Sequence, residues 1–260
     1  MRDATHLLHQ LFARHAKCLK KSGVDSGMAR KPEMLHEPRV VRYTDNHWKH
    51  LLTLRSKAIE ILNKLETNGF KPFVYGSVAR GDTTKSSDID LIVLRPLSSY
   101  RLELVLGQTI KRELVQATPS MVLKGHIHLP GNIVVTFPLF KLRPREEEFY
   151  RWGGLIDQNG LKNKLRIAGV DKRLVLIEPT ETGHLEQGVI GHEQEVSKKL
   201  NVSIEIARER VRVLTRRDNV GRTGVYLTRT LNDDESFEAV AKNLQDSDPA
   251  LRRTIHRRGG

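Results

Sequence analysis

The chain has 260 residues, of which 38% are hydrophobic and 29% are charged, and its formal net charge is +13 at pH 7. This length is enough for one large domain or two modest domains with a buried core. The single cysteine, Cys18, excludes an internal disulfide framework and predicts a reducing, cytoplasmic location. No apolar run of about eighteen residues occurs, so we expect no transmembrane helix and no membrane partner. The excess of positive charge favours a polyanionic partner such as RNA or DNA.

Residues 1–40 form a predicted basic N-terminal extension. Within it, residues 4–21 place leucines at helical spacing beside several lysines and arginines, which is typical of a basic amphipathic helix. The helix lacks the long apolar centre of a secretory signal, whereas a transit peptide stays open as an alternative. Two translation starts also stay open, Met1 and Met28, because Met28 follows a link typical of unstructured chain.

The next stretch predicts a long helix followed by two strands. Residues 46–67 carry apolar side chains at helical spacing, with Asn46 as a predicted cap and Asn68-Gly69 as the end. Residues 73–94 then read as strand, glycine turn, short helix, loop and strand.

The glycine turn and the second of these strands carry the residues that could bind a phosphate and a metal ion. Gly76 lets the backbone turn tightly and lets a ligand approach, and Ser77 caps a helix whose N-terminus suits a phosphate. Asp88 and Asp90 stand two residues apart at the start of an apolar strand, so their side chains face the same way. Two adjacent carboxylates need a compensating cation, and hard oxygen ligands beside a phosphate suit Mg²⁺.

The middle of the chain predicts a helix and a hairpin. Residues 98–117 show a helical stripe of apolar residues, and residues 120–128 and 132–140 read as two strands joined by a Pro-Gly turn. His126 and His128 share one strand face. Because no third ligand is near them in the sequence, we interpret this pair as surface or as a substrate contact rather than as a metal site.

A second predicted hairpin pairs residues 161–167 with residues 173–177, and residues 178–184 read as a linker. From about residue 233 the chain is polar and ends in paired arginines, which is typical of a disordered basic tail.

The segment between linker and tail predicts a helix over residues 192–200, a tight turn, a basic helix over residues 204–217 and a strand over residues 225–229. This order resembles a winged helix-turn-helix module, in which the basic helix and the wing would contact nucleic acid. Protein docking stays open as an alternative. The predicted nucleic-acid-binding residues are Arg208, Arg212, Arg216 and Arg222.

The stretch Gly76-Ser77-Val78-Ala79-Arg80-Gly81, followed by Ser87-Asp88-Ile89-Asp90-Leu91, resembles the signature of the DNA polymerase β-like nucleotidyltransferase superfamily, and most of all its minimal members. The resemblance implies an α+β fold. A mixed sheet flanked by helices would occupy residues 41–180, and a small helical, winged helix-turn-helix-like domain would follow at residues 185–260.

The resemblance also implies a reaction, the transfer of a nucleoside monophosphate from an NTP to a hydroxyl acceptor with release of pyrophosphate. Asp88 and Asp90 would be catalytic and would hold Mg²⁺. The nucleotide-binding residues would be Gly76, Ser77, Arg80 and Lys85.

One feature departs from the family pattern. A third carboxylate usually stands on the strand after the Asp-x-Asp strand, but residues 133–138 contain no acid, and Thr136 takes the place. An alternative function is therefore a nucleic-acid-binding regulator with a degenerate nucleotidyltransferase domain. A further alternative is a toxin–antitoxin pair with a small helical protein, since minimal nucleotidyltransferases often act in such pairs. Other acids that could reach the site are Glu103, Asp171 and Glu178, with Glu146, Glu147 and Glu148 on a predicted helix.

Overall fold

The computed structural model describes residues 32–221 and 224–258. The chain divides into two compact units, Met1–Arg30 and Lys31–Gly260, and the following description concerns the second. The helix predicted over residues 4–21 lies outside the described residues.

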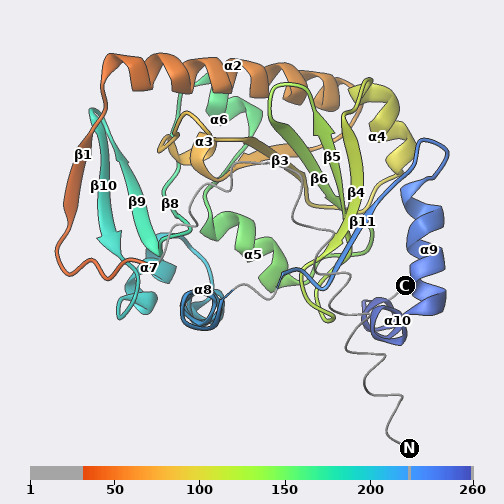
Figure 1. The fold of residues 1–260 in the computed structure, drawn as a ribbon. Helices are drawn as coiled ribbons and strands as arrows, with labels where there is room; N and C mark the ends of the chain where they lie inside the picture. Colours follow the sequence, from red (N-terminus) through yellow and green to blue (C-terminus); the bar gives the residue numbers. More distant parts are fainter. Residues whose placement is uncertain (1–31, 222–223, 259–260) are drawn as a thin grey trace, which may run out of the picture. The chain divides into compact units, whose positions relative to one another are not determined.

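A seven-stranded mixed sheet forms the centre of this unit (Figure 1). Its order is β11-β4-β5-β6-β3-β2-β7, in which β3 and β6 run parallel and all other neighbours run antiparallel. The strands are β2 (Pro72–Tyr75), β3 (Ile89–Val93), β4 (Lys111–Gln116), β5 (Lys124–Leu129), β6 (Ile133–Pro138), β7 (Leu155–Ile156) and β11 (Leu227–Thr230).

Helices cover both faces of this sheet, and successive strand residues point alternately into two separate cores. Leu91 and Val135 point into the larger core, which receives side chains from several helices, and Ile92 points into a smaller core with Tyr150 of α5 (Pro144–Trp152). The helices that supply the larger core are α2 (Asp45–Thr67), α3 (Ser77–Arg80), α4 (Ser99–Leu106), α6 (Gln158–Lys162), α9 (Phe237–Ser247) and α10 (Pro249–His256).

A second, four-stranded sheet has the order β1-β10-β9-β8. It packs with α7 (Glu193–Lys199) and α8 (Ile204–Val220) around a third core that includes Trp152. Its strands are β1 (Arg39–Arg42), β8 (Gly169–Val170), β9 (Val175–Thr180) and β10 (Gly183–Gly188).

The α+β fold with a mixed, helix-flanked sheet is confirmed, and so are its longest predicted elements. The helix predicted over residues 46–67 is α2, although its cap is Thr44, whose hydroxyl accepts a hydrogen bond from the His47 amide, rather than Asn46. The predicted hairpin over residues 120–140 is β5 and β6, joined by a turn in which Gly131 and Asn132 have positive φ.

The prediction of one helix over residues 98–117 is wrong. The chain forms α4 only as far as Leu106, Gly107 takes a φ of +76°, and residues 111–116 form β4. The apolar spacing of this stretch is compatible with a helix and with a strand, and pairing of β4 with β5 stabilises the strand.

Three further predictions in the C-terminal half are wrong. Residues 161–167, predicted as the first strand of the hairpin, comprise the end of α6 and irregular chain. The predicted second strand is β9, which pairs with the two-residue β8 and also with β10, and the β9–β10 turn lies between Thr180 and Gly183, inside the predicted linker. The predicted tail folds as α9 and α10, whose Phe237 and Leu251 are fully buried in the larger core. The strand predicted as a wing is β11, which pairs with β4 at the edge of the central sheet. The helix pair α7–α8 is present, but a winged module is not confirmed.

Candidate active site

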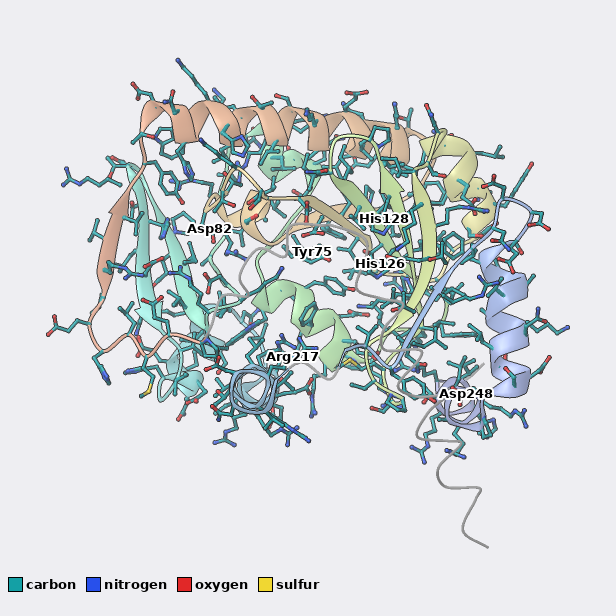
Figure 2. All side chains as sticks on the ribbon, viewed as in Figure 1. Tyr75, Asp82, His126, His128, Arg217 and Asp248 are labelled. Atoms are coloured by element: carbon teal, nitrogen blue, oxygen red, sulfur yellow. The ribbon has the colours of Figure 1, made fainter. Side chains whose placement is uncertain are left out.

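One face of the central sheet gathers the polar residues of four strands. The register places Asp90 of β3 beside Val134 of β6, and Val134 beside His128 of β5. The next row on this face joins Ile92, Thr136, His126 and Glu113 in the same way. Residues that pair across strands project to the same side, so these side chains share a face with Asp90. Figure 2 shows Tyr75, His126 and His128 on this part of the sheet.

The glycine turn lies directly against Asp90. Gly76 has a φ of +80°, which favours glycine, and a Cβ at this position would lie 3.9 Å from Asp90 Oδ2. The Gly76 amide donates to the Gly154 carbonyl at 3.0 Å. The predicted short helix is α3, a single turn whose N-cap is Gly76 rather than the predicted Ser77. The dipole of so short a helix gives little support to an anion.

Helix α2 holds the loop that joins α3 to β3. His47 Nε2 donates to the Gly81 carbonyl at 2.8 Å, and His50 Nε2 donates to the Thr84 carbonyl at 2.9 Å. The Ser87 hydroxyl accepts from the Thr84 amide at 2.8 Å, and the Ser77 hydroxyl donates to it at 3.3 Å. These bonds hold the conformation of the loop between the glycine turn and the two aspartates.

Arg55 of α2 supports α3 from below. Its Nε and Nη2 donate to the carbonyls of Val78 and Ala79 at 3.1 Å and 3.0 Å, and its Nη1 donates to the Leu165 carbonyl at 2.7 Å. Burial, with a smaller contribution from the charge of Arg166, lowers the pKa of Arg55 to about 10. Two of the carbonyls that Arg55 binds, those of Val78 and Ala79, have no partner within a one-turn helix.

The two predicted phosphate-binding cations differ in their surroundings. Arg80 is buried, and its guanidinium donates to Asp82 at 3.0 Å and 2.9 Å and to the Gly153 carbonyl at 2.6 Å. Its charge is thus already paired, and its contacts are those of a residue that holds the loop. Lys85 is exposed on that loop.

The carboxyl group of Asp90 has a raised pKa. Burial, followed by the nearby charge of Asp88, raises its pKa to about 6, while the positive charges of Lys172 and Arg80 act in the opposite direction. Two carboxylates with incomplete compensation suit an additional cation. Lys172 lies in the turn between β8 and β9. The sequence analysis did not single it out, because no local pattern relates this turn to the aspartate pair.

Within residues 32–221 and 224–258, Asp88 and Asp90 form no group with a third carboxylate, imidazole or thiol in which all ligand atoms lie within 4.8 Å of one another. The predicted substitutes have other partners: Glu103 pairs with Arg112 at 2.7 Å, Asp171 with Arg173 at 2.6 Å and Glu178 with Lys199 at 2.8 Å. Glu146 pairs with Arg258 at 2.6 Å, and Glu148 accepts from the Ser203 hydroxyl at 2.6 Å. Val134 stands beside Asp90 in the register, a position that the sequence analysis did not single out.

A cavity of about 790 Å³ opens between α5 and α8. Its lining includes Lys124, Tyr150, Arg210 and Arg217, together with the Phe149 ring, over which the Arg210 guanidinium lies at 5.0 Å. Tyr150 packs edge-on against Tyr75 at 5.0 Å, and Tyr75 pairs with Asp90 in the register. Tyr150 and Tyr75 therefore lie between the cavity and Asp90.

Three of the four predicted nucleic-acid-binding arginines lie on α8 at spacings of four residues. Arg208, Arg212 and Arg216 are exposed, and this spacing places them on one helix face. Arg222 lies outside the described residues.

The comparison with known families agrees with the motif. Residues 55–179, from α2 to β9, match the family model of the nucleotidyltransferase domain, and this range includes Gly76, Ser77, Asp88 and Asp90. No curated protein and no solved structure matches the chain. Among the described residues, no helix is long and apolar enough to cross a membrane. The family match supports the nucleotidyltransferase superfamily for this part of the chain, and with it nucleotidyl transfer in general.

Proposed function

We propose that the protein transfers a nucleoside monophosphate from an NTP to a hydroxyl acceptor and releases pyrophosphate, with Mg²⁺ held by Asp88 and Asp90. The observation that carries this proposal is the pair of like-charged carboxylates beside the Gly76 turn, in a domain that matches nucleotidyltransferases. A site whose negative charge is only partly compensated, next to an open backbone turn, fits a divalent cation and the phosphates that it binds.

Residues of this chain take distinct parts in the proposed reaction. Gly76 leaves room for the triphosphate beside Asp90, and Ser77 and the exposed Lys85 contact its phosphates. Lys172, whose charge already acts on Asp90, stabilises negative charge on the leaving pyrophosphate. When bound, Mg²⁺ supplies positive charge to the transferred phosphoryl group.

The cavity between α5 and α8 is the proposed place for the acceptor. Charges of both signs line it: Glu146, Glu148, Glu205 and Glu209 stand beside five lysines and arginines. Lys124, Arg210 and Arg217 can bind phosphate groups of the acceptor, and the Phe149 ring can stack on a base. The acceptor that these side chains fit best is the end of a nucleic-acid strand.

The activity test is incubation of the protein with labelled NTPs, Mg²⁺ and total cellular RNA or total protein. We expect label transfer to RNA that the Asp88→Asn/Asp90→Asn variant does not produce. Equal labelling by the wild type and this variant would contradict the proposal.

Affinity for Mg²⁺-NTP is expected to depend on the ionisation of Asp90. Its folded pKa is about 6, so the carboxylate form that binds the cation dominates above pH 6 and is lost as the pH falls through that value. Below it, we expect Kd to rise about tenfold per pH unit for one competing proton. Calorimetric titrations with Mg²⁺-ATP from about pH 5 to pH 8 measure this, and Asp90→Asn is the control because phosphate groups also titrate near pH 6. If Kd changes with pH in the same way for the wild type and Asp90→Asn, the ionisation of Asp90 does not control Mg²⁺-NTP binding.

The alternative function is a nucleic-acid-binding regulator, and the arginine stripe of α8 favours it. If Arg208, Arg212 and Arg216 each contact one phosphate, their replacement by Gln is expected to weaken RNA or DNA binding for all sequences. The slope of log K against log salt is expected to fall in magnitude by about three. Fluorescence anisotropy at several salt concentrations measures the slope. The charge-matched control removes three exposed lysines of α2, which are Lys49, Lys57 and Lys64. An equal loss in the control would indicate a general charge effect instead of a binding stripe.

A further inference from the structure

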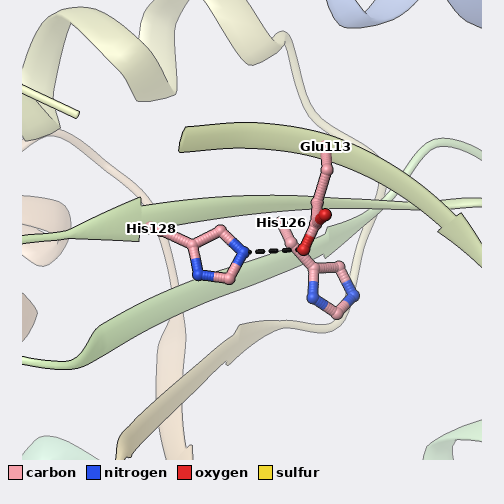
Figure 3. A group of neighbouring side chains, drawn as sticks. All are labelled: Glu113, His126 and His128. Atoms are coloured by element: carbon pink, nitrogen blue, oxygen red, sulfur yellow. Dashed lines mark hydrogen bonds and ion pairs between the residues drawn. The ribbon is translucent and has the colours of Figure 1, made fainter. Parts of the chain in front are cut away.

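A second group of potential ligands lies on the same sheet face as Asp90, on strands β4 and β5. Glu113 of β4 and His126 and His128 of β5 each offer one ligand atom, and these three atoms lie within 4.8 Å of one another (Figure 3). His128 Nε2 and Glu113 Oε1 are 2.8 Å apart. The sequence predicted no third ligand for the histidine pair, because residues 98–117 read as one helix and Glu113 could not be placed on a neighbouring strand.

His126 has an unused coordinating atom. Its Nε2 is buried and has no hydrogen-bond partner among the described residues. A buried polar atom without a partner is destabilising, so proteins rarely retain one without a use. In Figure 3 the His126 ring lies next to the Glu113 carboxylate, on the side opposite the His128 ring.

Glu113 is already oriented for a ligand role. Its Oε2 forms an ion pair with Lys111, which leaves Oε1 directed at His128. Outer partners of this kind commonly fix the orientation of a coordinating carboxylate.

We propose that Glu113, His126 and His128 bind a divalent first-row transition metal ion of the Zn²⁺ class. Two imidazoles and one carboxylate suit such ions better than Mg²⁺, which prefers oxygen ligands. Tetrahedral bonds of about 2.0–2.2 Å to zinc place ligand atoms roughly 3.3–3.6 Å apart. His128 Nε2 and Glu113 Oε1, now 2.8 Å apart, would therefore separate slightly, and side-chain rotation would bring the His126 nitrogen to the same distance. Three protein ligands leave a fourth position for water or a substrate atom.

The proposed site is separate from the aspartate pair. Strand β6 stands between β3 and β5, and neighbouring strands lie about 4.8 Å apart, so the two sites are separated by roughly 10 Å on one face. The two sites also differ in ligand chemistry, and each can be removed without the other.

The test is a Co²⁺ and Zn²⁺ titration of the full chain after removal of bound metal with EDTA. Co²⁺ reports directly, because imidazole coordination gives visible absorption bands, and a chromophoric chelator gives the Zn²⁺ affinity by competition. The sequence also carries His6, His9, His15 and Cys18, so the readout is the difference between variants rather than the total amount bound. We expect His128→Gln and Glu113→Gln each to lose one equivalent of bound metal, with the loss of one set of absorption bands.

Two controls keep the result specific. His256→Gln removes an exposed histidine elsewhere, and Asp88→Asn/Asp90→Asn removes the other site, and both are expected to retain the equivalent. Unchanged stoichiometry and spectra in His128→Gln and Glu113→Gln, with normal circular dichroism, would overturn the proposal.

Discussion

Replacing Asp88 and Asp90 together by Asn is expected to abolish Mg²⁺-dependent NTP binding and to increase the stability of the fold at pH 7. The two effects have one cause. Burial and the charge of Asp88 raise the pKa of Asp90 to about 6, which means that the folded protein holds the ionised carboxylate at a cost. Below the ordinary pKa, this cost disappears because the acid is protonated in both states, and it is fully present above pH 6. An amide removes it at neutral pH.

The gain in the free energy of unfolding is expected to be on the order of 1–3 kcal/mol, because one pKa unit corresponds to about 1.4 kcal/mol. Urea denaturation at pH 7 measures the gain, and calorimetry with Mg²⁺-ATP measures the binding. Val93→Ala, a change in the same strand on the opposite face, is the control that should lower stability and leave binding intact. Retained Mg²⁺-NTP binding in the folded double mutant would remove the aspartates from the proposed site.

A third carboxylate placed beside Asp90 is expected to raise transfer activity by about tenfold or more, which corresponds to about 1.4 kcal/mol of transition-state stabilisation. The register makes Val134 the position for it, because Val134 pairs with Asp90, and it is only partly buried. Two-metal phosphoryl transfer uses such an acid to hold a metal beside the attacking hydroxyl. We therefore expect the natural chain to bind Mg²⁺-NTP well and to transfer slowly, and Val134→Asp to increase the rate at saturating NTP.

Position matters in this experiment as much as charge. Thr136→Asp places the acid on the same face but beside Ile92, two residues further along the strand, so it is expected to give a smaller gain. Val134→Asn has the same shape as Val134→Asp without its charge, and it is expected to give no gain. Equal single-turnover rates for all three variants and the wild type would contradict a missing carboxylate as the cause of slow transfer.

The part of the site that the sequence predicts well is local. Gly76, Ser77, Asp88 and Asp90 lie within fifteen consecutive residues, so a turn and the two-residue period of a strand are enough to bring them together. The residues that surround them come from far along the chain. Lys172 reaches Asp90 only through the fold of β8 and β9, and no local pattern marks it.

The errors in the fold have a similar physical origin. Residues 98–117 place leucines at helical spacing, and only the positive φ of Gly107 and the pairing of β4 with β5 turn the second half into a strand. That error hid Glu113. The tail from residue 233 contains many charges, and the apolar stripes of α9 and α10 are short. These stripes stabilise the two helices only because their side chains pack in the larger core.

The pairing of β11 with β4 has a consequence for how the chain is made. Strand β4 ends at Gln116, and its partner begins only at Leu227, so the ribosome releases an unpaired sheet edge long before the strand that covers it. An open edge presents free amide and carbonyl groups to other chains. Closing a loop of this length is also entropically costly and slows folding. A protein truncated before β11 should therefore aggregate during synthesis, although residues 55–179 alone carry the nucleotidyltransferase match.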